Sequence, residues 1–430
     1  MRKYQQLTLL LLTVLSVSIL VMYKRENAKL KYVLDVVNFF GRNDADAILK
    51  LENDTVQSAN VYDLGYPMAS WQWIGNNFHA YSAFWKQGSV SEITALVVGM
   101  PNVAVNFKCF VRFADKGKMK GRFSFARIHE NLSKDFKFYK FYCKYDGNMR
   151  KVVAVTLTNV DTKQEHTLLT RDLQNKQIRE KIPLTVCLDL SGYNENLDSF
   201  ANVINVQQFF YHYHILGATE FIVYGTKGMT TFLKNHLLRH GIQPNVFPYN
   251  FPFDETTQKP NRAIITIDCL LRTSNVAQFA VVAGINEYLY PFAARFKPNT
   301  DFYAFLELYE DKSNGGAAQF QVPTRQICIS PHNKLILADN NMSELLPKDS
   351  EKFYLYRPQY ENDANGNDEH NGSDKNDVKT IKLDENRISL NRYVNCTDTA
   401  NVFDWRHKID ENSLRYIDTI SKELNLYLMQ

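Results

Sequence analysis

The sequence predicts an α/β fold in the C-terminal half of the chain, preceded by a β-rich domain and an N-terminal transmembrane helix. Three features predict it: apolar strands alternating with helices over residues 184–283, period-two patterns over 62–170, and an apolar run near the N-terminus. The 430 residues are enough for about two domains. We therefore expect a tail and anchor at 1–25, a stem at 26–60, a β-rich domain at 61–180 and an α/β domain at 181–430.

The apolar run from Leu7 to Tyr23 carries no charge and is flanked by Arg2-Lys3 and Lys24-Arg25. As a helix it would span roughly 26 Å, which suits a thin early-secretory bilayer of about 27 Å. The alternative is a signal peptide cleaved near Ser16-Val17-Ser18. We favour an uncleaved anchor because the run is long and bulky residues follow Ser18. This predicts a single-pass type II membrane protein with a luminal body.

The cysteines and the glycosylation sequons fit a luminal body. None of the six cysteines has the CxxC spacing of a zinc site. An oxidising lumen permits up to three disulfides, and we expect Cys109 to pair with Cys143 because both lie in the β-rich domain. Buried free thiols are the alternative. Five N-glycosylation sequons occur, at Asn53, Asn131, Asn341, Asn371 and Asn395.

The β-rich domain is predicted from segments such as Val103 to Phe107 and Val152 to Leu157, in which β-branched and aromatic residues alternate with others. An aromatic cluster opens this domain: Trp71, Trp73, Phe78, Tyr81, Phe84 and Trp85. The rings would suit a sugar-stacking platform, but we expect them to form core. The net charge of +4 is small and scattered, so we do not expect a nucleic-acid partner.

The α/β domain is predicted from short apolar runs that alternate with amphipathic segments. We expect strands at Leu184–Leu188, Phe221–Tyr224, Asn245–Tyr249 and Gln278–Ala283. Helices are expected from about Phe200, Thr230 and Asn261, with Gly217 and Gly241 stopping the first two. Such alternation predicts a parallel sheet with crossover helices, whose ligands bind beyond the carboxyl ends of the strands. Residues 362–377 are of low complexity and are expected to form a disordered insert.

Several motifs, taken in order and spacing, carry a family resemblance. They are the passage Phe209 to Phe221, a tyrosine-rich helix ending at Leu-Gly-Ala, and the segments Asp268 to Arg272, Glu287 to Pro291 and Tyr354 to Pro358. Together they resemble glycosyltransferase family 92, a group of Golgi type II enzymes with a GT-A fold. The resemblance covers roughly half the chain and implies a GT-A-like, Rossmann-type mixed sheet with crossover helices. It also implies a Golgi location.

The resemblance implies transfer of a hexose, with galactose as the expected sugar, from a UDP-sugar to a glycan. The family's Asp-x-Asp-Glu motif corresponds here to Gly284-Ile285-Asn286-Glu287, and its His-His-Tyr-Arg element to Asn391-Arg392-Tyr393-Val394. Glycine offers no ligand atom and asparagine one neutral oxygen, whereas Mn²⁺ favours hard oxygen and imidazole donors. Glu287 and Asn286 are the only candidate metal ligands left, so a Mn²⁺ cofactor is doubtful.

Five residues are candidates for the site of such a transferase. Glu287 would act as the catalytic carboxylate, through metal, water or sugar, and Asn286 would hydrogen-bond ribose or phosphate. Arg262 and Arg357 would replace part of the missing metal charge, since guanidinium groups pair well with phosphate. Asp268 would orient the site. Each has a structural alternative: a solvated turn residue for Glu287, a turn former for Asn286, and ion-pair partners for Arg262 and Arg357. For Asp268 the alternative is helix capping or structural pairing.

Other polar residues are less distinctive. His212 and His214 are expected to be faces of the tyrosine-rich helix and not ligands, and Glu307 or Glu310 would also suit a catalytic base. Three hypotheses follow: an active, metal-independent transferase, a catalytically inactive glycosyltransferase-like protein that binds a glycan or a partner, and a membrane-anchored structural glycoprotein. The partners expected are a nucleotide sugar, a glycan acceptor and the membrane.

Overall fold

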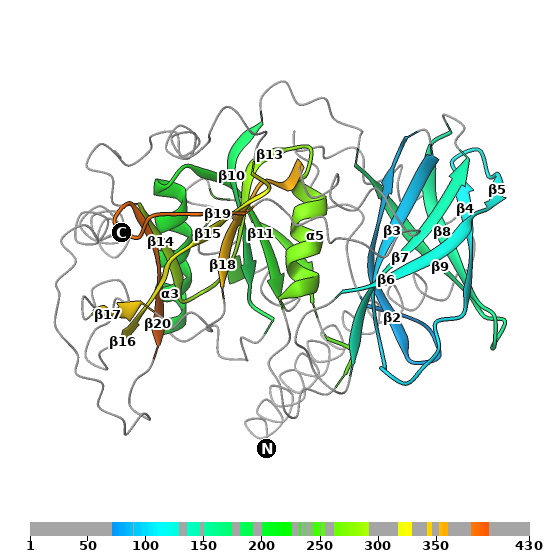
Figure 1. The fold of residues 1–430 in the computed structure, drawn as a ribbon, viewed down its shortest axis with the longest axis horizontal. Coiled ribbons are helices and arrows are strands. Elements are labelled where there is room, and N and C mark those ends of the chain that lie inside the picture. The colour runs from blue at the N-terminus through cyan, green and yellow to red at the C-terminus, as the bar shows by residue number, and fades with distance from the viewer. Residues whose placement is uncertain are drawn as a thin grey trace, which may run out of the picture. The chain divides into compact units, whose positions relative to one another are not determined.

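The structure is a computed structural model, and it describes parts of the chain between residues 71 and 394 (Figure 1). The described residues are 71–88, 90–128, 136–146, 150–173, 181–191, 200–225, 232–233, 237, 242, 244–249, 251–253, 262–291, 317–328, 342–345, 352–359 and 380–394. The stem, the insert at 362–377, the asparagines of all five sequons and the carboxylates Glu307 and Glu310 lie outside them.

The N-terminal part of the described chain is a single curled sheet. Its strands are β1 (Gln72–Gly75), β2 (Phe78–Lys86), β3 (Val90–Gly99), β4 (Phe107–Phe113), β5 (Lys118–Lys120), β6 (Arg122–Arg127), β7 (Lys137–Asp146), β8 (Val152–Asn159) and β9 (Glu165–Asp172). They lie in the order β5-β4-β8-β9-β2-β3-β7-β6, with β1 beside β2. Only Gly121 separates β5 from β6 in sequence, so the two ends of the order lie close together.

The buried side chains of this curled sheet explain two of its sequence features. A disulfide joins Cys109 on β4 to Cys143 on β7 and confirms the expected pairing. A side chain at Gly121 would collide with both of its sulphur atoms, so only glycine fits there. Most of the aromatic cluster is buried, as expected for core: Phe78, Tyr81, Phe84 and Trp85 are each at most 4% exposed. The exceptions are Trp71, which is partly exposed, and Trp73, which is 47% exposed.

The C-terminal part is built on a parallel arrangement of four strands. They are β10 (Ile182–Asp189), β11 (Ala218–Gly225), β12 (Asn245–Pro248) and β13 (Ala277–Gly284), in the order β12-β11-β10-β13. Helix α3 (Phe200–Ile215) lies between β10 and β11 in sequence, and α5 (Ala263–Thr273) between β12 and β13. The two helices lie on opposite sides of the sheet (Figure 1).

Successive side chains along β10 contribute alternately to two different hydrophobic cores. Val186 and Leu188 belong to the core that contains α3, whereas Cys187 between them belongs to the core that contains α5. Successive residues of a strand point to opposite faces, so a strand covered on both faces is apolar throughout. The α5 core also takes in Phe84 and Leu96 from the curled sheet, which therefore packs against this side.

Short strands from the last third of the chain complete two sheets. β18 (Phe353–Tyr356), β15 (Gln319–Val322) and β19 (Thr380–Lys382) extend the parallel strands beyond β13, so this sheet is seven-stranded and mixed. A separate four-stranded sheet has the order β14-β20-β16-β17, formed by Glu287–Pro291, Ile388–Val394, Thr324–Cys328 and Met342–Leu345. β20 therefore reaches back to lie beside the strand that begins at Glu287.

The predicted fold class is wrong. The four parallel strands were located correctly, but the elements that the structure describes comprise twenty strands and only two helices. This is a mostly β protein with a local parallel unit, not a Rossmann-type α/β protein. The fold class was predicted wrongly because the strands after residue 317 are only three to seven residues long. Runs so short show no period, and they pair with distant segments.

The predictions of a membrane anchor, of a single-pass type II protein and of a Golgi location are corrected as well. Across the ranges described above, no helix is both long and apolar enough to cross a bilayer. The run from Leu7 to Tyr23, on which those predictions depended, lies outside these ranges.

Candidate functional site

The carboxyl ends of β10 and β13 meet at the point where the chain changes direction across the sheet. From β10 the chain adds β11 and β12 on one side, and then β13 on the other. In parallel arrangements, ligands bind beyond the strand ends at such a switch point, because the two connections diverge there. Asp189, the last residue of β10, is in register with Gly284, the last residue of β13. These two residues mark the candidate site.

The turn after β13 buries its one carboxylate. Glu287 is 1% exposed and accepts a hydrogen bond of 2.7 Å from the Gly284 amide. It also accepts bonds from Arg262 Nη1 at 2.6 Å and from Arg392 Nε at 2.9 Å. Burial by itself would raise the pKa of Glu287, but the two guanidinium groups and the amide outweigh it and lower the pKa from 4.5. Glu287 is therefore an ionised, fully engaged carboxylate and not a solvated turn residue.

Arg262 lies across the switch point. It immediately precedes α5, and its side chain bridges Glu287 and Asp189, the latter through a 3.3 Å contact between Nε and Oδ2. A methyl group added to Gly284 would lie 2.7 Å from Arg262 Nη2, so the guanidinium fills the space in which a side chain at position 284 would begin. The side chain of Arg262 is still 26% exposed.

Arg392 is the functional candidate that the sequence analysis did not single out. It enters from β20, where it is directly opposite Glu287 on β14, and its Nη2 lies 2.8 Å from Glu287 Oε1. Its side chain is 19% exposed. The only sequence signal was its place in the segment that corresponds to the family's His-His-Tyr-Arg element. Strand pairing over 105 residues of sequence, which no local pattern reports, brings it to the site.

Asn286 holds the turn to β20 and does not serve a ligand through its amide nitrogen. Its Nδ2 donates to the Tyr393 carbonyl at 2.7 Å, and its own carbonyl accepts from the Tyr393 amide at 2.9 Å. The turn-forming alternative therefore describes this residue better than ribose or phosphate binding.

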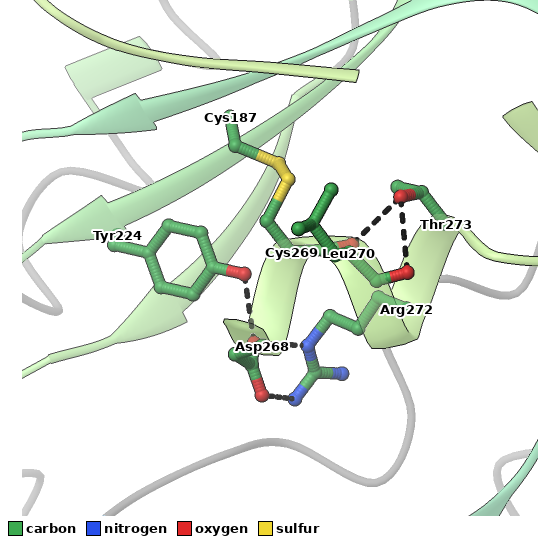
Figure 2. Close-up of a disulfide and its surroundings, with 7 residues drawn as sticks. All are labelled: Cys187, Tyr224, Asp268, Cys269, Leu270, Arg272 and Thr273. Atoms are coloured by element: carbon green, nitrogen blue, oxygen red, sulfur yellow. Dashed lines mark hydrogen bonds and ion pairs between the residues drawn. A yellow bond between two sulfur atoms is a disulfide. The ribbon is translucent and has the colours of Figure 1, made fainter. Parts of the chain in front are cut away.

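Asp268 lies away from the switch point, inside α5, and is completely buried (Figure 2). It accepts hydrogen bonds from Tyr224, from Ser82 of the curled sheet at 2.6 Å and from Arg272 one helical turn later. The neighbouring Cys269 is joined to Cys187 of β10 by a second disulfide. Asp268 is thus a structural hub that fixes α5 between two sheets.

Arg357 is also placed elsewhere. It is 5% exposed, and its guanidinium lies over the rings of Phe279 and Phe320, at 5.1 and 5.6 Å. Phe279 is five residues before Gly284 on β13, so Arg357 packs near the beginning of the strand and the candidate site lies at its end. Arg357 therefore has a structural role, packing against aromatic rings, and the ion-pair alternative for it stays a prediction.

The residues present do not fit a divalent cation. Within the described ranges, no three of the side chains of His, Cys, Asp and Glu gather as metal ligands would. A divalent cation bound to Glu287 would lie close to two guanidinium groups, and even two unit charges about 4 Å apart repel by about 4 kcal/mol at an effective dielectric constant of 20. His212 is no ligand either, because it is buried and bonded to the Leu289 carbonyl at 2.8 Å.

Comparison with known proteins adds little. No family model matches the sequence, and no curated protein matches it, so the resemblance to glycosyltransferase family 92 stays a prediction. Among solved structures, HddC from Yersinia pseudotuberculosis is 10% identical, covers 46% of this chain and 89% of its own, and has a TM-score of 0.24.

Two further solved structures are similarly distant. The inositol-1-phosphate CTP transferase from T. maritima is 7% identical over 56% of this chain and 97% of its own, with a TM-score of 0.29. The 4-diphosphocytidyl-2C-methyl-D-erythritol synthase from Anaerococcus prevotii is 9% identical over 57% and 96%, with a TM-score of 0.24. None of the three is described as a glycosyltransferase, and TM-scores this low do not establish a shared fold.

Proposed function

We propose that the switch point between β10 and β13 binds the diphosphate of a nucleotide sugar, and that the chain is a transferase built around that donor. One observation carries the proposal: two partly exposed arginines, Arg262 and Arg392, converge on the buried Glu287 beside Gly284. Guanidinium groups held in fixed orientation are well suited to bind phosphate oxygens in pairs.

The position of α5 supports anion binding at the same edge. The helix lies between two parallel strands in sequence, so its N-terminus lies at the carboxyl edge of the sheet. Arg262 occupies its N-cap position and provides no side-chain cap for the first turn. The partial positive charge at the N-terminus of a helix dipole favours an anion.

More specifically, we propose that the protein transfers a hexose to a glycan hydroxyl. The family resemblance implies that this hexose is galactose. Such a reaction needs a base near the acceptor, and Glu287 does not suit that role because three donors already engage its oxygens. Asp189 is the other carboxylate at the described switch point. Its Oδ1 accepts from the Ser191 hydroxyl at 2.6 Å, and its side chain is 11% exposed.

The same engagement of Glu287 favours a second candidate function. A chain that retains the binding edge but keeps its turn carboxylate locked in ion pairs would bind a nucleotide sugar or glycan without turnover. The two candidates share the binding site and differ only in chemistry, so binding and turnover have to be measured separately.

The experiment is a calorimetric titration of the full chain with UDP, UDP-galactose and CDP, with uridine as the control that lacks phosphate. Binding of the diphosphates, and at least tenfold weaker binding of uridine, is the expected result. Release of UDP from UDP-galactose in the presence of glycan acceptors would then identify the transferase, and binding without release the second function. Equal affinity for uridine and UDP, or no binding at all, would reject a diphosphate site.

A further inference from the structure

We infer that this site takes its diphosphate without a divalent cation, with Arg262 and Arg392 as the fixed positive charges and Glu287 as the residue that positions both. The inference deepens the proposed function and rests on it. It names the substrate group, the charge that meets it and the role of the buried carboxylate.

The space beside Gly284 is filled by Arg262. Because Arg262 Nη2 would lie 2.7 Å from a Cβ at this position, the guanidinium occupies the volume that a ligand side chain here would use. The glycine therefore does more than remove a metal ligand from the turn. It also leaves space beside the backbone at the end of β13 for the Arg262 guanidinium.

The Glu287 carboxylate is neutralised by two arginines. Its two oxygens are divided between the two arginines, Oε2 to Arg262 at 2.6 Å and Oε1 to Arg392 at 2.8 Å. A carboxylate so neutralised has little charge left for a cation. The two arginines are held in place by these contacts, and their side chains are still 26% and 19% exposed.

The contacts with Glu287 also restrict the conformational freedom of the two arginine side chains. An arginine side chain loses conformational freedom when it binds a ligand, and that loss weakens binding. Here the buried Glu287, itself fixed by the Gly284 amide, has already ordered both guanidinium groups. Glu287 is thus a positioning residue that acts through the arginines.

The test compares nucleotide binding by the full chain in EDTA with binding in Mn²⁺, together with a titration of Mn²⁺ alone followed by electron paramagnetic resonance. We expect UDP affinity to be the same in both conditions and no bound Mn²⁺. Mn²⁺-dependent UDP binding would overturn this inference and leave the proposed function standing. Absence of UDP binding in both conditions would overturn both.

Substitutions at Arg262 and Arg392 test whether each positive charge contributes to UDP binding. Arg262→Gln or Arg392→Gln should weaken UDP binding about 10- to 100-fold, the loss typical of one charged hydrogen-bonding group. Uridine binding should be unchanged, because uridine lacks the phosphates. Arg392→Lys keeps the charge but loses the planar fork, and should fall between wild type and Arg392→Gln. Equal UDP affinity in wild type and both Gln variants would overturn the inference.

Glu287→Gln tests positioning. It keeps the shape of the side chain but loosens both arginines, so UDP affinity should fall and its salt dependence should rise while uridine binding stays the same. Glu287→Gln with unchanged UDP binding would remove the positioning role.

The account of position 284 has a test of its own. Gly284→Asp combined with Asn286→Asp restores both carboxylates of the family's motif. This double variant should still bind no Mn²⁺, because the carboxylate introduced at position 284 meets Arg262 first. Tight Mn²⁺ binding by the double variant would contradict the account.

Discussion

Asp268 and Arg272 form the most deeply buried ion pair that the structure describes, with side chains 0% and 1% exposed. Two charges this far from water are tolerated because each is paired and hydrogen-bonded. Tyr224 and Ser82 donate to Asp268, and the Arg272 guanidinium lies over the ring of Phe247 at 4.0 Å. The pair joins α5 to β11 and to β2 of the curled sheet.

We expect Asp268→Asn to lower the free energy of unfolding by about 3–5 kcal/mol, because it leaves the Arg272 charge buried without a counter-charge. Urea unfolding of the purified chain measures this. Asp146→Asn is the matched control, since Asp146 pairs with Arg122 but its side chain is 88% exposed. The control should lose less than about 1 kcal/mol. Similar losses for the two variants would show that Asp268 is not a structural hub.

Helix α3 packs on β14 and holds the backbone of the strand that begins with Glu287. Tyr213 donates to the backbone carbonyl of Glu287 at 3.0 Å, and one residue earlier His212 bonds the Leu289 carbonyl through Nε2. Both side chains are completely buried. The helix therefore fixes the backbone of β14, while Arg262 and Arg392 fix the Glu287 side chain.

His212 should make the protein sensitive to mild acid. Burial lowers its pKa from 6.5 to about 4, although the bond to Leu289 opposes the shift. The unfolded chain therefore takes up a proton below pH 6.5 that the folded chain takes up only near pH 4, so stability falls as the pH drops through this window. The total loss is about 3 kcal/mol at 1.36 kcal/mol per pH unit.

Urea unfolding between pH 7 and 4 checks this. His212→Gln keeps a possible donor to Leu289 but does not titrate, and its stability should depend less on pH than that of the wild type. His214→Gln, on the exposed side of the same helix, is the control for replacing a histidine of this helix by glutamine. If His212→Gln and wild type lose stability in parallel, His212 does not titrate as expected.

The second disulfide, Cys187–Cys269, closes a loop with a sequence separation of 82 residues and joins the central strand to α5 (Figure 2). The first, Cys109–Cys143, closes a separation of 34 residues inside the curled sheet. A cross-link restricts the unfolded chain more when its loop is longer. The two bonds therefore differ in what they contribute, even though both are buried.

Replacing Cys187 and Cys269 together by Ala should lower the free energy of unfolding by about 4–5 kcal/mol. Replacing Cys109 and Cys143 should lower it by about 4 kcal/mol, in the chain-entropy description. Urea unfolding of both double variants under identical conditions measures which of them loses more stability. The predicted order of the two losses is a sharper test than either value alone. A larger loss for the Cys109 and Cys143 variant would show that local packing outweighs loop length.

The sequence by itself determined the local elements with strong periodicity: the four apolar strands of the parallel unit, the α5 helix and the β-rich N-terminal part. These depend on side-chain patterns within about ten residues, which a single sequence displays. The pairing of Cys109 with Cys143 followed instead from the prediction that both lie in one domain. The sequence also pointed to the turn at Gly284 and to Arg262 as parts of one site. It led to the wrong fold class, because short strands such as β18 and β20 have no period of their own.

Only the tertiary structure decided what the candidate residues do. Arg392 reaches Glu287 because β20 pairs with β14 across 105 residues of sequence, and no local pattern contains that pairing. Asp268 and Arg357 looked like site residues by type, but burial among aromatic rings and paired charges makes them structural. A charged residue's role depends on which charge it meets and how much water it sees, and both are set by contacts between distant segments.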